Sequence, residues 1–387
     1  MGIEPLLLSE KVSDVSIADR LTGQDPRAAS LDVNGRLQSV DGLRGVAILL
    51  VVGFHFFNAH QDLFPYGSSF SKVPFFNYGF TGVDLFFIIS GFVIALTLER
   101  CRSSFDFLLR RIIRIWPALL VSAIVVFVLL NVSQSPAAQQ HRPAWADFIP
   151  SLTLTPNVLW RGIYPKIDHI NSVYWTLVIE AQFYAIAAAI FWLCGRKHFS
   201  RNLAIFTVVN ILIRAAIKRL FPGFALIIYQ TMQLTDFMPW FAAGAIFFDL
   251  YKGRLTQVTA AALLSTMFII IVRTATFNSQ PLGIILFAIV FFFAFWLISV
   301  HHRIGNAFAF PPLVWVGAAS YSIYLYHEPV GMVLISSVPK SLSVGLQVTI
   351  VLLITTSVLL IGYLSFKTVE IPSARALKRI WLDPGRQ

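Results

Sequence analysis

Ten long apolar runs, separated by short polar connections, dominate the hydrophobic pattern of this chain. They lie near residues 43–60, 79–98, 112–132, 172–194, 202–220, 235–251, 256–274, 281–299, 312–336 and 344–366. Each run is close to the ~20 mostly apolar residues with which an α-helix crosses a bilayer. The pattern therefore predicts an all-α integral membrane protein with about ten transmembrane helices. Between the fifth and sixth runs, residues 224–233 have the character of a re-entrant or interfacial piece.

More polar segments flank the apolar runs at both ends. Residues 1–38 lack the apolar core that a signal peptide requires, so we expect a cytoplasmic, largely disordered N-terminal tail. We expect residues 39–373 to form the transmembrane domain and residues 374–387 to form a cytoplasmic C-terminal tail.

The overall composition favours lipid as the solvent of these helices. Hydrophobic residues make up 57% of the chain and charged residues only 13%, against about 25% charged residues in a typical soluble domain. A net charge of +11 would suit nucleic-acid binding in a soluble protein. Here the basic residues lie in the connections between apolar runs, which indicates a topology signal and no nucleic-acid partner.

The Lys and Arg residues of the connections predict the orientation. Alternate connections carry sixteen of them on one side and nine on the other, and the richer loops are short. Short basic loops stay in the cytoplasm. We therefore predict a multi-pass protein of the inner (plasma) membrane with both termini in the cytoplasm. The sequence leaves the oligomeric state open, a homo-oligomer included.

Seven ionisable residues fall within or at the edges of the predicted spans, where a charge costs at least ~2.5 kcal/mol on insertion scales. They are Arg44, His55, Asp84, Glu180, Asp236, His327 and Glu328. Arg44 and His55 are eleven residues apart, about three helical turns, so they share one face with an axial separation of ~16 Å. An alternative interpretation is a snorkelling arginine and a hydrogen-bonded structural histidine.

Two further arginines stand at the start of the third run. Arg111 and Arg114 are three residues apart and therefore lie on one helical face. Paired guanidinium groups suit phosphate or pyrophosphate recognition, although a topology signal explains the pair without any ligand.

The expected depths of His55, Glu180 and His327 bring these three residues into the same outer layer of the membrane. Asp84, near the outer end of the second span, is either a partner of His55 or a satisfied polar cap. Ser90 and Gly91 in the same span more often indicate close helix packing than chemistry.

Six separated motifs, in this order, resemble those of the membrane-bound acyltransferase-3 family. They are Asp41-Gly-Leu-Arg44-Gly with His55; Gly82-Val-Asp84-Leu-Phe-Phe-Ile-Ile-Ser90-Gly91-Phe92; Arg110-Arg111-Ile-Ile-Arg114-Ile-Trp-Pro117; Trp175-Thr-Leu-Val-Ile-Glu180-Ala-Gln-Phe183-Tyr184; Ser320-Tyr321-Ser-Ile-Tyr324-Leu-Tyr-His327; and Glu370-Ile-Pro372. Each motif is weak alone, whereas the ordered set spans nearly the whole chain and is specific.

The resemblance implies a ten-helix O-acyltransferase that takes an acyl group, most often acetyl, from cytoplasmic acyl-CoA. It would deliver this group to an acceptor on the far side of the membrane, without a metal. The commonest acceptor in the family is a cell-surface polysaccharide or oligosaccharide, although an antibiotic or a lipid-linked oligosaccharide fits these residues equally well. Some members carry a hydrolase-like domain after the last helix; we expect none here, since the chain ends at Gln387.

The resemblance also implies roles for single residues. Arg44 and His55 match an arginine and a histidine that the family needs for activity, and Arg111 and Arg114 match an implicated pair. The three arginines would hold the CoA phosphates, while His55 would act as general base or, alternatively, as an acylated intermediate. Glu180 or Asp84 would orient the imidazole ring. The candidate acceptor contacts are Trp175, Tyr321 and His327.

A different class of protein also fits the buried charges. In a secondary transporter or flippase, the same ionisable residues would form a proton relay. That interpretation predicts inverted repeats, and the two halves of this sequence do not match. A non-catalytic sensor or scaffold leaves the shared face of Arg44 and His55 unexplained.

Overall fold

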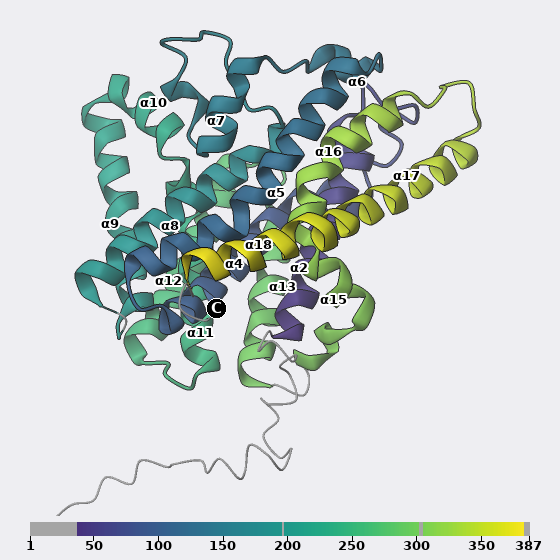
Figure 1. Ribbon diagram of the computed structural model, residues 1–387. Helices are drawn as coiled ribbons and strands as arrows, with labels where there is room; N and C mark the ends of the chain where they lie inside the picture. Colours follow the sequence, from purple (N-terminus) through teal and green to yellow (C-terminus); the bar gives the residue numbers. More distant parts are fainter. Residues whose placement is uncertain (1–36, 196, 302–304, 383–387) are drawn as a thin grey trace, which may run out of the picture.

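The computed structural model describes residues 37–195, 197–301 and 305–382. Within these ranges it contains helices and no strand, gathered into one bundle (Figure 1). Apart from its last two residues, the N-terminal tail predicted for residues 1–38 lies outside the described part of the chain.

A helix occupies each of the ten places that the apolar runs predicted. These helices are α2 (Gln38–Phe54), α4 (Gly82–Arg100), α5 (Ser104–Val132), α8 (Trp175–Cys194), α9 (Phe199–Leu220), α11 (Met238–Tyr251), α12 (Gln257–Phe277), α13 (Pro281–Val300), the pair α15 (Pro311–Ala318) and α16 (Ser320–Ser336), and α17 (Val344–Ser365). In the described ranges, seven helical segments are long and apolar enough to cross a membrane. The helices α9, α11 and α15–α16 are not among them. The all-α membrane fold is therefore confirmed, and the number of ten spans stays a prediction.

Short helical segments complete the chain. They are α3 (Pro74–Asn77), α6 (Pro136–Gln140), α7 (Phe148–Thr153), α10 (Pro222–Thr231) and α18 (Ile371–Trp381); the 3₁₀ helices η3 (Gly79–Thr81), η4 (Trp145–Asp147), η5 (Asn157–Leu159), η6 (Ser172–Tyr174), η7 (Gln233–Asp236) and η8 (Asn306–Ala309); and the π-helical η2 (His55–Ala59) and η9 (Phe366–Glu370). The segment that the sequence suggested as re-entrant or interfacial thus contains most of helix α10.

Helix α5 begins eight residues before its predicted start because polar side chains cap it. The Ser103 hydroxyl accepts a hydrogen bond from the Asp106 backbone amide at 3.1 Å, which satisfies one of the free amides of the first turn. The Asp106 carboxylate in turn accepts from Arg110 Nε at 2.7 Å. As a result, Arg111 lies inside the helix together with Arg114 rather than ahead of it.

Two other helices differ from the predicted bounds. The ninth run forms two helices because the chain leaves helical geometry at Ala319, between α15 and α16. Helix α17 continues through η9 into α18, which gives 38 helical residues from Val344 to Trp381. The first part of the predicted C-terminal tail is therefore helical, and α18 lies against α5 (Figure 1).

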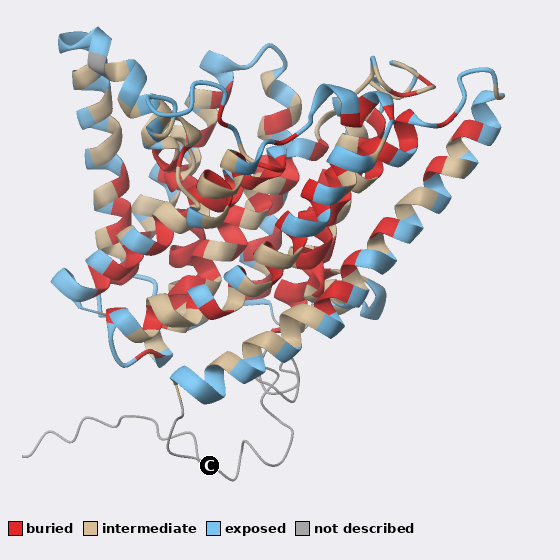
Figure 2. Ribbon diagram, turned by 45° about the horizontal axis from the view of Figure 1, so that its top comes forward, coloured by how far each residue is buried: buried red, intermediate tan, exposed pale blue. Residues whose placement is uncertain are grey.

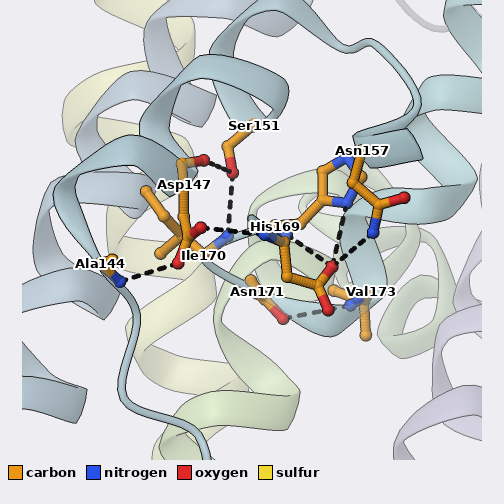
Figure 3. Close-up of polar contacts among 9 residues, drawn as sticks. Ala144, Asp147, Ser151, Asn157, His169, Ile170, Asn171 and Val173 are labelled. Carbon is orange, nitrogen blue, oxygen red and sulfur yellow. Dashed lines mark hydrogen bonds and ion pairs between the residues drawn. The ribbon is translucent and has the colours of Figure 1, made fainter. Parts of the chain in front are cut away.

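The long connection between α5 and α8 is ordered by hydrogen bonds to one carboxylate (Figure 3). Asp147 accepts from the backbone amides of Ala144 at 2.8 Å and Asp168 at 2.9 Å. The Ser151 hydroxyl donates to the Asp147 carbonyl oxygen at 2.6 Å and accepts from the Ile170 amide at 2.9 Å. The segment that leads into α8 is thereby tied to η4 and α7.

The centre of the bundle is built on close contact between α4 and α11. All residues of α11 from Met238 to Phe248 are buried, whereas α17 is largely exposed at the edge of the bundle (Figure 2). A Cβ atom on Gly91 of α4 would lie 2.0 Å from the Phe241 carbonyl oxygen, and one on Gly244 of α11 would lie 2.0 Å from that of Ile88. The two backbones therefore touch, as small residues allow in membrane bundles. This agrees with the packing role that the sequence suggested for Gly91.

We predict that Gly91→Ala destabilises the protein, because the methyl group meets backbone that cannot rotate away. The expected cost is about 1–3 kcal/mol, the usual range for overpacking. Thermal unfolding of the purified protein in detergent measures the effect. Gly345→Ala is the matched control, since a Cβ atom there meets nothing within 4 Å. Equal unfolding midpoints for the two variants would contradict the proposed backbone contact.

Candidate active site

Three cavities that share lining residues run through the bundle. The basic cavity is lined by parts of α2, α4, α5 and α18, and the histidine cavity contains His55 and Trp175 in its wall. The central cavity shares lining residues with both. It shares Arg44, Arg111 and Arg114 with the basic cavity, and Val83 and Tyr324 with the histidine cavity. The arginines and the histidine that the sequence singled out thus line one chain of adjoining spaces.

Arg111 carries unsatisfied hydrogen-bond donors. Its side chain is only 9% exposed, and its Nη2 atom donates to Thr97 Oγ1 at 3.4 Å. The Nε and Nη1 atoms are buried, and no described residue accepts a hydrogen bond from either. The rings of Phe107 and Tyr184 lie 5.7 and 5.8 Å from the guanidinium carbon. Leaving such donors unpaired is costly, so the site suits an anionic ligand such as a phosphate group.

The other two arginines border the same space. Arg44 donates to Asp41 at 2.7 Å, one helical turn earlier in α2, and both residues line the basic cavity. Arg114 lines the basic and the central cavities together with Arg111. The structure therefore brings together the three residues predicted to bind phosphate.

Hydrogen bonds indicate which nitrogen of His55 carries the proton. Nδ1 of the buried His327 lies 2.8 Å from the Tyr324 carbonyl oxygen, which can only accept, so this nitrogen carries hydrogen. In the neutral ring, His327 Nε2 is then an acceptor, and it lies 3.2 Å from His55 Nδ1. His55 Nδ1 also lies 2.9 Å from the Val51 carbonyl oxygen. Nδ1 of His55 therefore carries hydrogen, which leaves Nε2 as the basic nitrogen.

The backbone at His55 changes its geometry. Helix α2 ends at Phe54, and residues His55–Ala59 form the π-helical η2. Such π-helical turns occur frequently at functional sites. His55 itself is only half-buried and lines the histidine cavity.

Two acidic residues were predicted to orient His55, and the hydrogen bonds of the structure differ from this prediction. Glu180 accepts from Ser90 at 3.2 Å and from the Tyr184 hydroxyl, and it lines the central cavity beside the arginines. Asp84 lines the histidine cavity with His55, but no hydrogen bond joins these two described residues. A role of Asp84 or Glu180 in orienting His55 therefore stays a prediction, since equal depth along the helix axes does not by itself make two side chains neighbours across the bundle.

The predicted acceptor contacts lie in different places. Trp175 lines the histidine cavity, with its ring 5.6 Å from that of Phe237. Tyr321 lines the basic and central cavities instead, and its hydroxyl donates to the Ile115 carbonyl oxygen at 2.9 Å. His327 is buried against His55. Of the three, only Trp175 borders the cavity that contains His55.

The structure also adds partners that the sequence did not assign. Glu328 lies 3.2 Å from His60 Nε2 and accepts from the Ser172 hydroxyl. The rings of His55 and His60 are 6.2 Å apart, so this acidic group belongs to the surroundings of His55. The signal available in the sequence was the position of Glu328 directly after His327 in an apolar run. In the described ranges, no three His, Cys, Asp or Glu residues are grouped as metal ligands.

Two ion pairs of one aspartate border the histidine cavity. Asp236 accepts a hydrogen bond from Arg214 at 2.8 Å and forms an ion pair with Arg273 at 2.6 Å, while Arg273 also donates to the Asp236 backbone carbonyl at 2.9 Å. Asp236 and Arg273 both line the cavity. The aspartate that the sequence counted among the membrane charges is thus paired, as buried charges require.

Known proteins resemble this chain in sequence. A family model of the acyltransferase-3 type, described as an acyltransferase domain, matches residues 37–366. The peptidoglycan O-acetyltransferase of Listeria monocytogenes is 26% identical over 332 residues, which are 76% of this chain and 49% of that protein. The putative peptidoglycan O-acetyltransferase of Bacillus subtilis is 27% identical over 330 residues, 76% of this chain and 48% of that protein. An O-acetyltransferase of Staphylococcus aureus is 25% identical over 368 residues, 87% of this chain and 57% of that protein.

This chain spans about half the length of the curated relatives that it matches. No solved structure matches it. The family match includes five of the six motifs, together with the helices that line the three cavities, except α18 and all but the first residue of η9. By this match, the chain belongs to the acyltransferase-3 family.

Proposed function

We propose that this protein transfers an acetyl group from cytoplasmic acetyl-CoA to a hydroxyl group of an extracytoplasmic cell-wall glycan. The chain of cavities carries the proposal, because arginines line one end and the basic nitrogen of His55 belongs to the other. The relatives named as peptidoglycan O-acetyltransferases support a glycan acceptor. In the proposed topology of ten spans with cytoplasmic termini, the basic cavity opens to the cytoplasm and the histidine cavity opens to the outside.

The donor would bind along the cavities. Arg44, Arg111 and Arg114 hold the CoA phosphates by charge-assisted hydrogen bonds. The pantetheine arm extends through the central cavity over the ~16 Å that separates Arg44 from His55 along the helix axis. The thioester then reaches the histidine cavity, while the nucleotide stays on the cytoplasmic side. Coenzyme A itself does not need to cross the membrane.

The transfer step would use His55 as general base. The glycan lies in the histidine cavity against Trp175, and Nε2 of His55 takes the proton of its hydroxyl as the oxygen attacks the thioester carbon. The carbon–sulfur bond breaks, and the CoA thiolate leaves and receives the proton from the imidazolium. Removing such a base costs on the order of 10²–10⁴-fold in rate. His327 acts as a positioning residue, because its hydrogen bond holds the tautomer of His55.

We predict that His55→Ala abolishes acetyl transfer and leaves acetyl-CoA binding within about twofold of wild type, because the base is lost while the arginines remain. Free CoA released from acetyl-CoA in the presence of cell-wall glycan measures turnover, and calorimetric titration measures binding. Persistent turnover in a folded His55→Ala protein would contradict the role of His55. If folded wild-type protein bound no acetyl-CoA, the acyltransferase proposal itself would fail, and transport assays in sealed vesicles would become the next test.

We predict that Arg111→Gln weakens acetyl-CoA binding by about tenfold or more, because hydrogen bonds to charged groups contribute about 1.5–3 kcal/mol. Arg102→Gln is the matched control, since it removes the same charge from an exposed residue that does not line the basic cavity. The measurement is the dissociation constant of each variant. Equal losses in the two variants would indicate general electrostatic attraction in place of a binding contact.

We predict that His327→Leu lowers kcat at least about tenfold with little change in KM for acetyl-CoA, because part of the general-base contribution is lost with the tautomer. His327→Gln should recover much of this loss, since its amide oxygen can accept the hydrogen bond from His55 Nδ1. A purely structural role for His327 would make the two variants equally inactive.

A further inference from the structure

Helix α18 turns one face toward the basic cavity. The residues that line the cavity are Ile371, Ala374, Arg375 and Lys378. Their spacing of three, four and seven residues puts them on one side of the helix. The family match ends at residue 366, before α18 begins, so this wall of the cavity lies outside it.

The opposite face of α18 carries an exposed apolar side chain. At about 100° per residue, Ile380 lies opposite the cavity-lining residues and is 62% exposed, and Leu377 lies between the two faces. An amphipathic helix with such a face lies in the membrane interface with its apolar side in lipid. The basic side is then directed away from lipid, toward the cavity and α5, against which α18 packs (Figure 1).

The basic cavity has a surplus of positive charge. Among the described residues that line it, seven are basic and two, Asp41 and Glu370, are acidic. Arg44 is paired with Asp41, whereas Arg111 has two buried nitrogen atoms to which no described residue offers an acceptor. A cavity with this balance suits a ligand that carries more than one phosphate group.

The cations lie in two groups along the cavity. Arg44, Arg111 and Arg114 line the basic and the central cavities, so they stand where the two spaces join. Arg100, Arg110, Arg375 and Lys378 line the basic cavity alone, so they belong to the part beyond that junction. Arg110 is paired with Asp106 at 2.7 Å, and Arg375 and Lys378 lie together on α18. Coenzyme A has the matching order, since its pyrophosphate adjoins the pantetheine arm and its 3′-phosphate lies farther out on the ribose.

We propose that Arg375 and Lys378 of α18 bind the ribose 3′-phosphate of the acyl-CoA donor, which makes α18 a part of the donor site. This inference rests on the proposed function, because it assigns a second phosphate contact to the same donor. It adds specificity for the 3′-phosphate, which the three arginines at the junction do not supply.

The test compares CoA with 3′-dephospho-CoA as ligands of the full chain in detergent, by calorimetric titration. Wild-type protein should bind CoA about tenfold more tightly than 3′-dephospho-CoA, the effect of one charge-assisted contact. In the double variant Arg375→Gln/Lys378→Gln, this ratio should fall close to one, with the affinity for 3′-dephospho-CoA unchanged. Arg379→Gln is the matched control, because Arg379 is a basic residue of α18 that does not line the cavity, and it should keep the wild-type ratio.

Two outcomes would overturn the assignment. A wild-type ratio near one means that the 3′-phosphate is not recognised, and a tenfold ratio that survives the double substitution means that other residues bind it. The double variant could instead bind less well to vesicles with anionic lipids while its ratio of CoA to 3′-dephospho-CoA affinity stays that of wild type. That result would assign Arg375 and Lys378 to the membrane surface. Failure of the proposed function has a different signature, namely no CoA binding by folded wild-type protein. The unfolding midpoint of each variant verifies that it is folded.

Discussion

The cost of placing polar and charged groups inside an apolar helix bundle governs this structure. Each such group must find a partner or border a cavity, because hydrocarbon offers neither hydrogen bonds nor solvation. Asp236 pairs with two arginines, Glu328 accepts from Ser172 and lies beside His60, and Glu180 accepts from Ser90 and Tyr184. Two nitrogen atoms of Arg111 find no hydrogen-bond acceptor among the described residues. Arg111 borders the basic cavity, where a bound anion would supply these acceptors. The proposed donor site therefore lies beside the group whose hydrogen bonds are incomplete.

Helix α4 both lines the cavities that polar groups border and packs at the centre of the bundle. Its residues line all three cavities, from Val83 and Asp84 in the histidine cavity to Thr97 and Arg100 in the basic cavity. The glycine contacts between α4 and α11 hold α4 against a largely buried helix. A rigid helix along all three cavities keeps the arginines and His55 at fixed distances from each other. The proposed transfer reaction needs such fixed distances.

The basic cavity and the histidine cavity differ in chemistry as the proposed reaction requires. Guanidinium groups suit phosphates that remain in water, and a neutral imidazole suits proton transfer in a half-buried cavity. Tyr324 joins the two ends, because its ring lines the central and histidine cavities while its backbone carbonyl holds the tautomer of His327. A single residue thus contributes to the shape of the path and to the state of the base.

The sequence by itself determined where the helices form, and it predicted that Arg44, His55, Arg111 and Arg114 belong to one site. Apolar length sets where a helix forms, and a rise of 1.5 Å per residue sets the depth of a side chain along its own helix. Only the tertiary structure decided which side chains meet. It shows that His327 contacts His55, that Tyr321 lines the same cavities as the arginines, and that α18 lines the basic cavity. Depth is a local property of one helix, whereas lateral neighbours depend on how all helices pack, and no pattern within one apolar run encodes that.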